Sequence, residues 1–186
     1  DHVAHADPVD TQIHVLAGGP CSGKTTLLEA LAQAGYATRA ETAKTWLEQA
    51  TPHELKSMRM DPVAWQRRVF SVDVETTIEI PPDDVVFCDT SCVENLIFGE
   101  RAGLAFGPNT QAWLDRYRYR RVFFCEPLTD YEQTIIRSET QEVALAISDQ
   151  IAKRYQDLGY DVVRVPALSV EDRIALIERT IHNERN

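Results

Sequence analysis

IHVLAGGPCSGKTTLLEAL, residues 13–31, joins a β-branched run to a leucine-rich segment through a loop of glycine, proline, cysteine, serine and lysine. The run before the loop belongs to residues 11–18, which have the pattern of a buried strand that ends in glycine. The segment after it places three leucines on one face of a helix and a glycine where that helix would end. The loop is therefore expected to lead from a strand to a helix N-terminus.

The loop matches G-x-x-x-x-G-K-[ST] at every specified position, from Gly18 to Thr25, in the strand–loop–helix context that this pattern requires. Glycines let backbone N–H groups close around phosphate oxygens, and the helix N-terminus adds partial positive charge. Lys24 is expected to reach the β- and γ-phosphates, and the Thr25 hydroxyl to bind Mg²⁺. A plain turn, the alternative, would need neither lysine nor threonine. The residues expected to bind the nucleotide are Gly18, Gly19, Pro20, Cys21, Ser22, Gly23, Lys24, Thr25 and Thr26.

The composition is that of a soluble globular protein, with 186 residues, 44% of them hydrophobic and 26% charged. The formal net charge of −10 argues against a nucleic-acid partner, because overall acidity repels phosphate backbones. No apolar run reaches the roughly 20 residues that a membrane helix needs. We predict a cytoplasmic protein in which residues 1–10 form a disordered tail, residues 11–186 form a single P-loop domain, and the four cysteines are reduced.

Strand and helix patterns alternate five times along the chain, which predicts a parallel sheet covered by helices on both faces. The expected strands are residues 11–18, 36–41, 85–89, 119–127 and 161–166, and the expected helices are residues 24–35, 42–50, 62–80, 91–101, 130–158 and 169–181. Residues 51–54 are interpreted as a break. Ligands of such sheets bind outside the carboxyl ends of the strands, so the residues that follow each strand are the candidates for function.

Two acids lie at the ends of predicted strands. Asp89 ends the strand at 85–89, as the acid of a Walker B strand does, and is expected to hold Mg²⁺ directly or through water. Glu41 ends the strand at 36–41, where a carboxylate could take a proton from an acceptor hydroxyl or a water. The alternatives are an ordinary turn aspartate at 89 and, at 41, an N-cap or first-turn acid that stabilises the next helix through its dipole.

Arginines and a tryptophan are further candidates. Arg137, in the predicted long helix, could close over the phosphates as a lid residue and neutralise charge that develops during transfer; the alternative is a solvated residue paired with a neighbouring glutamate. Trp65 fits the apolar stripe of its helix and is interpreted as core, while Gln66 or Arg67 could face an acceptor pocket. A basic cluster is either a solvated surface or a contact for an anionic second substrate. It comprises Arg101, Arg116, Arg118, Arg120 and Arg121.

Five segments carry a family resemblance: GGPCSGKTTLLEAL (18–31), GYATRAETAK (35–44), WQRRVF (65–70), VVFCDTS (85–91) and YQDLGYDVVRVPALSVEDRIALI (155–177). Together they resemble the AAA-domain predicted ATPases of the P-loop kinase type, a group similar to the ribosylnicotinamide kinase domain of NadR proteins. Many of these ATPases have Asp-Arg after the third strand. This chain has Asp89-Thr90, which looks closer to the NadR kinase type.

The resemblance implies a five-stranded parallel sheet in the order 2-3-1-4-5, with a lid in the long helical stretch. It also implies roles for matching residues. These are nucleotide contacts at Gly23, Lys24 and Thr25, the strand-three acid at Asp89, the acid after strand two at Glu41, and the lid arginine at Arg137.

We therefore predict an ATP- and Mg²⁺-dependent phosphotransferase of the P-loop, nucleoside-kinase-like class, which moves the γ-phosphoryl group to a small-molecule acceptor. The expected catalytic residues are Lys24, Glu41, Asp89 and Arg137, and the expected metal ligands are Thr25 and Asp89. The alternative is an ATP- or GTP-hydrolysing switch that acts on a protein or lipid partner, although no N-K-x-D motif that reads guanine follows a later strand. A binding module without turnover is disfavoured because Lys24 and Thr25 are both present. A homodimer is left open.

Overall fold

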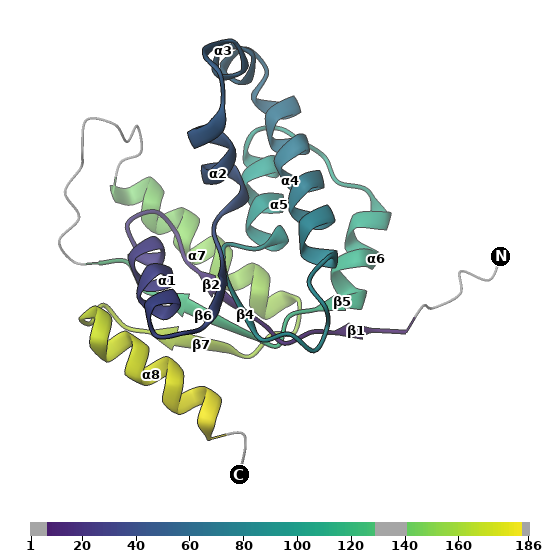
Figure 1. The fold of residues 1–186 in the computed structure, drawn as a ribbon. Helices are drawn as coiled ribbons and strands as arrows, with labels where there is room; N and C mark the ends of the chain where they lie inside the picture. The colour runs from purple at the N-terminus through teal and green to yellow at the C-terminus, as the bar shows by residue number, and fades with distance from the viewer. Residues whose placement is uncertain (1–6, 129–140, 184–186) are drawn as a thin grey trace.

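A five-stranded parallel sheet forms the centre of the molecule (Figure 1), for which the computed structural model describes residues 7–128 and 141–183. Its strands are β2 (Ile13–Ala17), β3 (Ala37–Arg39), β4 (Val86–Asp89), β6 (Arg121–Cys125) and β7 (Val162–Val165). They lie in the order β3-β4-β2-β6-β7, and every neighbouring pair is parallel. Counted along the chain this is the order 2-3-1-4-5, so the predicted α/β fold is confirmed.

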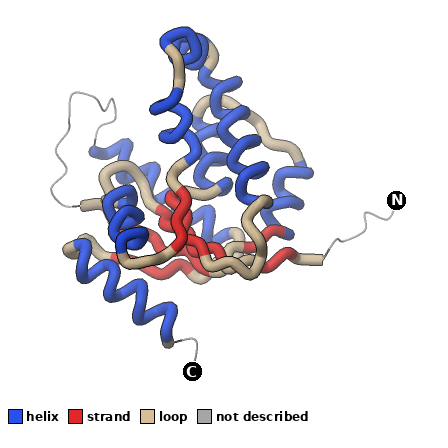
Figure 2. The backbone as a smooth tube through the Cα atoms, in the orientation of Figure 1, coloured by secondary structure: helices blue, strands red, loops and turns tan. Residues whose placement is uncertain are grey.

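Helices cover both faces of the sheet (Figures 1 and 2). In the described residues they are α1 (Lys24–Gln33), α2 (Thr42–Gln49), α3 (Pro52–Met60), α4 (Pro62–Ile78), α5 (Cys92–Arg101), α6 (Pro108–Arg116), α7 (Gln141–Asp157) and α8 (Val170–His182). Ile13 and Val15 of β2 pack in one core with residues of α5 and α7, while Leu16 packs in a second core with residues of α1 and α8. Alternate strand residues point to opposite faces, so one buried strand serves two cores.

Helices α2, α3 and α4 form a projection above the sheet, which we call the helical lobe (Figure 2). Its middle helix occupies a segment whose start was predicted to be a break. Thr51 and Glu54 instead form a capping box: the Thr51 N–H donates to Glu54 Oε2 at 2.7 Å, and the Glu54 N–H donates to Thr51 Oγ1 at 3.3 Å. Pro52 stands in the first turn, where a missing N–H costs nothing. The signal at 51–54 is therefore a helix start.

The N-terminal residues depart from the prediction of a disordered tail over residues 1–10. Val9 and Asp10 form a short strand, β1 (Val9–Asp10), that pairs in parallel with β5 (Tyr117–Arg118). The Thr11 N–H extends this pairing by donating to the Arg118 carbonyl at 3.0 Å. The prediction is wrong for these two residues because an adjacent backbone edge offers them hydrogen bonds. The division into a tail and one domain otherwise stays a prediction.

The long helix expected over residues 130–158 is present as α7 in its described part, and residues 130–140 lie outside the described residues. Gly159 follows it with a φ of 83°, a conformation that glycine adopts without strain. Within residues 7–128 and 141–183, no helix has the length and apolar character needed to cross a membrane.

Candidate functional site

Residues 18–25, the loop between β2 and α1 together with the first two residues of α1, fold tightly against the carboxyl ends of the strands, and we call them the phosphate loop. Gly18 has a φ of 146°, and a Cβ there would lie 2.7 Å from the Cys125 carbonyl oxygen, so the position requires glycine. Gly23, with a φ of 77°, is the N-cap of α1 and provides no side-chain cap. The first amides of α1 are therefore open to an anionic ligand.

Lys24 is the cation of the loop, and acidic and hydroxyl groups surround its ammonium. The Nζ atom lies 3.2 Å from Thr90 Oγ1, 3.3 Å from Glu94 Oε2 and 3.7 Å from Asp89 Oδ1. Burial works against the charged form, but the carboxylates of Glu94 and Asp89 outweigh it and raise the pKa of Lys24. Lys24 is thus charged, and its ammonium is held beside Asp89, Thr90 and Glu94.

The Thr25 hydroxyl and the Asp89 carboxylate, the two predicted metal ligands, lie side by side. Thr25 Oγ1 donates to Asp89 Oδ2 at 3.3 Å, and Asp89, at the end of β4, is buried. Mg²⁺ prefers oxygen ligands and is usually held by one or two protein groups together with substrate phosphates and water. A hydroxyl and a carboxylate side by side fit that preference, so the donor set suits magnesium.

Glu41 lies between β3 and α2, at the N-cap position of α2 that the alternative interpretation proposed. Its side chain makes no capping hydrogen bond, however. Burial raises the pKa of Glu41, and the charge of Lys24 partly offsets this rise. The carboxyl group therefore belongs to the electrostatic environment of the phosphate loop, while its role as a base stays a prediction.

Glu94 is a site residue that the sequence reasoning missed. It lies in the first turn of α5 and is fully buried, where Oε1 accepts from the Tyr155 hydroxyl at 2.9 Å and Oε2 from Lys24. Burial raises the pKa of Glu94 to about 7, against the opposing effects of Lys24 and Tyr155. An acid inside the apolar run CVENLI (residues 92–97), just after Asp89, was the available signal.

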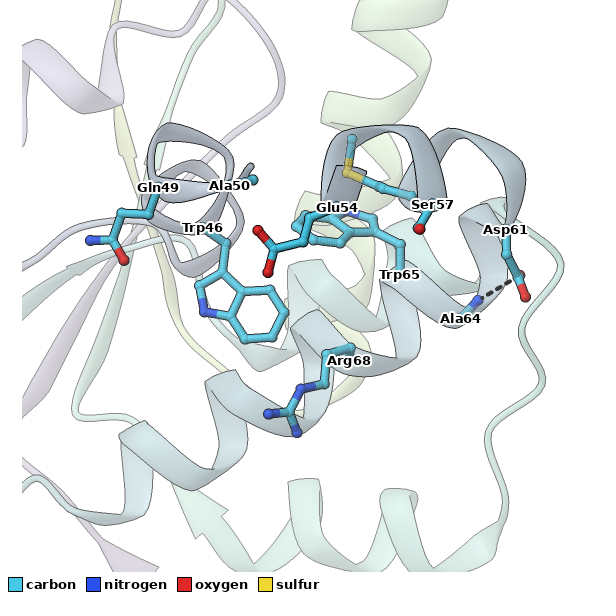
Figure 3. Close-up of a pocket in the computed structure, with 10 residues that line it drawn as sticks. Trp46, Gln49, Ala50, Glu54, Ser57, Asp61, Ala64, Trp65 and Arg68 are labelled. Carbon is cyan, nitrogen blue, oxygen red and sulfur yellow. Dashed lines mark hydrogen bonds between the residues drawn. The ribbon is translucent and has the colours of Figure 1, made fainter. Parts of the chain in front are cut away.

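A cavity of about 810 Å³ lies in the helical lobe, between α2, α3 and α4 (Figure 3). Trp46 and Trp65 line it with their ring centroids 5.6 Å apart, and the Arg68 guanidinium lies 5.3 Å from the centre of the Trp46 ring. Trp65 was interpreted as core, but it is only half-buried and faces this cavity. The pocket-facing basic residue of α4 is Arg68, and the predicted candidates Gln66 and Arg67 are not among its lining.

Two of the predicted arginines, Arg118 and Arg121, lie away from the site. Arg137 lies outside the described residues. Of the basic cluster, Arg118 donates to the Leu158 carbonyl at 2.9 Å and lies 3.9 Å from the centre of the Tyr160 ring. Arg121, at the start of β6, is buried against Phe123. These two arginines pack at the amino ends of the strands, the opposite edge of the sheet from the phosphate loop, which favours a structural role over a contact with substrate.

Comparisons with known proteins agree on the fold. A family model described as AAA domain matches residues 13–173, and a search of curated proteins gave no match. A solved NadR protein in complex with NR is similar to the chain, with a TM-score of 0.62 and 18% identity, over 84% of this chain and 46% of the NadR chain. Shikimate kinase from Aquifex aeolicus vf5 has a TM-score of 0.51 and 16% identity, over 93% of this chain and 97% of the kinase. The chain thus spans about half of the NadR chain, and at these identities the likeness shows the fold alone.

Proposed function

The chain belongs to the AAA-domain family and has a P-loop, kinase-like fold, and on this premise we propose that it is an ATP- and Mg²⁺-dependent phosphotransferase with a small-molecule acceptor. One observation carries the proposal. Lys24, Thr25 and Asp89 converge at the phosphate loop, with the Thr25 hydroxyl 3.3 Å and the Lys24 ammonium 3.7 Å from the Asp89 carboxylate. A turn that served only to connect β2 and α1 would need no such convergence.

Each residue would then have a defined task. The loop amides and Lys24 would hold the β- and γ-phosphates, and Thr25 and Asp89 would hold magnesium, which supplies charge neutralisation at the phosphates when bound. The bond between the γ-phosphorus and the β,γ-bridging oxygen breaks, a bond from the acceptor oxygen to phosphorus forms, and ADP leaves. Glu41 would accept the acceptor's hydroxyl proton, a task that its raised pKa suits. Arg137 stays a prediction as the lid residue.

We infer that the acceptor binds in the cavity of the helical lobe. Its volume of about 810 Å³ falls within the range of small-molecule sites. Helix α2 begins directly after Glu41, and Trp46 lies about 7.5 Å further along the helix axis by the rise of 1.5 Å per residue. Two half-buried indoles provide flat apolar surfaces, which favour an acceptor that carries a planar ring.

The test is ADP release from ATP and Mg²⁺, with and without a panel of acceptors. The panel contains nucleosides, vitamins and sugars, with ribosylnicotinamide and shikimate added because the two solved structures of similar fold are a NadR protein in complex with NR and a shikimate kinase. We expect turnover that depends on one ring-bearing acceptor. Turnover that no acceptor changes would favour the nucleotide-hydrolysing switch, and nucleotide binding without any turnover would favour a binding module.

A further inference from the structure

Arg173 is a buried arginine behind the phosphate loop, and all three nitrogens of its guanidinium donate to backbone carbonyls. It lies in the first turn of α8 with 2% of its surface exposed. Nε donates to the Pro166 carbonyl at 2.9 Å, Nη2 to the Glu126 carbonyl at 3.0 Å, and Nη1 to the Ser22 carbonyl. Within residues 7–128 and 141–183 it forms no ion pair with a carboxylate.

The bond to Ser22 fixes the direction of one peptide group in the loop. The C=O of residue 22 and the N–H of residue 23 belong to the same planar trans peptide and point in opposite directions. Arg173 binds the Ser22 carbonyl from behind the loop, on the side away from the space enclosed by the loop. The Gly23 N–H must therefore point into that space. The preceding peptide is oriented in the same way, since the Leu128 N–H donates to the Cys21 carbonyl at 3.1 Å. Two successive amides are thereby turned toward the space that an anion would fill.

The charge of Arg173 also matters because the front of the loop is acidic. The charges of Asp89, Glu94 and Glu41 all raise the pKa of the single Lys24 ammonium. Three carboxyl groups therefore surround this one cation. A guanidinium on the back of the Ser22–Gly23 peptide adds a positive charge that pairs with no carboxylate of residues 7–128 and 141–183. Hydrogen bonding to a carbonyl polarises the peptide and makes its N–H a stronger donor.

We propose that Arg173 is a positioning residue for polyphosphate binding, which holds the Ser22–Gly23 peptide with its N–H turned inward and strengthens that donor without touching the nucleotide. This rests on the proposed function to the extent that the ligand is a nucleoside polyphosphate. The same side chain joins the phosphate loop to the segments after β6 and β7. Arg173 therefore links the ligand-holding peptide to two other segments at the carboxyl edge of the sheet.

The test compares Arg173→Met, which keeps the length but removes charge and donors, with Arg173→Lys, which keeps the charge. Arg179→Met is the matched control, because Arg179 is an exposed arginine on the same helix. The affinities for ADP and for inorganic triphosphate are measured by calorimetry. In protein labelled with ¹⁵N-glycine, the Gly23 amide is followed by NMR, and thermal unfolding reports on the fold.

We expect Arg173→Met to weaken both ligands about tenfold and Arg173→Lys to recover part of this loss, with no change in Arg179→Met. The Gly23 amide proton should move upfield in Arg173→Met without ligand, which a merely structural role would not cause. A folded Arg173→Met protein with parental affinity and an unmoved Gly23 signal would overturn the proposal. If Arg173→Met does not fold, parental affinity in Arg173→Lys would overturn it too.

These measurements use binding and not turnover, so the two proposals can fail separately. An unmutated protein that binds ADP but transfers no phosphoryl group would refute the phosphotransferase and leave the role of Arg173 standing. An unmutated protein that binds neither ADP nor inorganic triphosphate would refute both.

Discussion

The phosphate loop is held from behind by the segments after β6 and β7 and by α8, whereas the helical lobe rests on the sheet through few buried side chains. Helices α2 and α3 contain no fully buried residue. The lobe is connected through α4, where Val69 and Thr77 are buried and Asp73 accepts from Arg39 at 2.9 Å, Thr42 at 3.1 Å and Asn95 at 2.7 Å. The difference teaches that backbone geometry fixes the nucleotide half of the site, while side chains on a thinly packed lobe would define the acceptor half.

Lys24→Ala is expected to have the largest effect, because it removes the cation that Asp89, Glu94 and Glu41 surround at the phosphate loop. We expect ADP release to fall about a thousandfold. The fold should persist, since Glu94 has a pKa of about 7 with Lys24 present and can take up a proton when that cation is removed. Activity and thermal unfolding are measured together, with the exposed Lys153→Ala as control. Full activity in Lys24→Ala would remove the proposed phosphate role.

Asp89→Asn should separate metal binding from nucleotide binding within the same half of the site. The amide keeps the size of the side chain but loses the charge that a hard cation requires. We expect the Mg²⁺ concentration for half-maximal turnover to rise about tenfold, while the affinity for ADP without metal changes little. A magnesium titration that matches that of the unmutated protein would exclude Asp89 as the metal acid.

Trp46→Ala tests the other side of the comparison, the acceptor half. Losing one aromatic face of the cavity should raise the KM for the acceptor about tenfold and leave the KM for ATP unchanged. Leu47→Ala, an exposed neighbour on the same helix, is the control. Equal effects on both KM values, or none on either, would place the acceptor outside the helical lobe.

The contrast between local sequence patterns and contacts from distant segments also explains which features the sequence could predict. The strands, their alternation with helices and the phosphate loop depend on local patterns, and each was predictable. The capping box at Thr51 was also readable, but Pro52 suggested a break. Glu94 and Arg173 are buried, as are Ile97 and Ile177 one helical turn further on, so helical spacing could predict which face they occupy. Their partners come from distant segments, so no local pattern could supply them.

The last expected effect is on stability and not on activity, and it concerns His14, on the strand that leads into the phosphate loop. Burial, with the charges of Arg121 and Arg120, lowers the pKa of His14 from 6.5 to about 4, and its ring stacks on Phe87 with centroids 5.0 Å apart. Between pH 6.5 and about 4, His14 binds a proton in the unfolded chain but not in the folded chain. The free energy of unfolding should therefore fall as the pH drops from 6.5 toward 4, by up to about 1.4 kcal/mol per pH unit from this group.

Glu94 acts in the opposite direction, because its raised pKa makes the folded chain bind the extra proton between pH 4.5 and about 7. The His14 contribution is isolated by subtracting the pH profile of His14→Leu, which retains Glu94, from that of the unmutated protein. We expect the difference between the two unfolding free energies to be flat above pH 6.5 and to slope below it. Parallel profiles down to pH 4 would mean that His14 is charged in the folded sheet. The strand that leads into the phosphate loop would then contain a buried cation. Charge as well as packing would distinguish the phosphate-loop half of the site from the helical lobe.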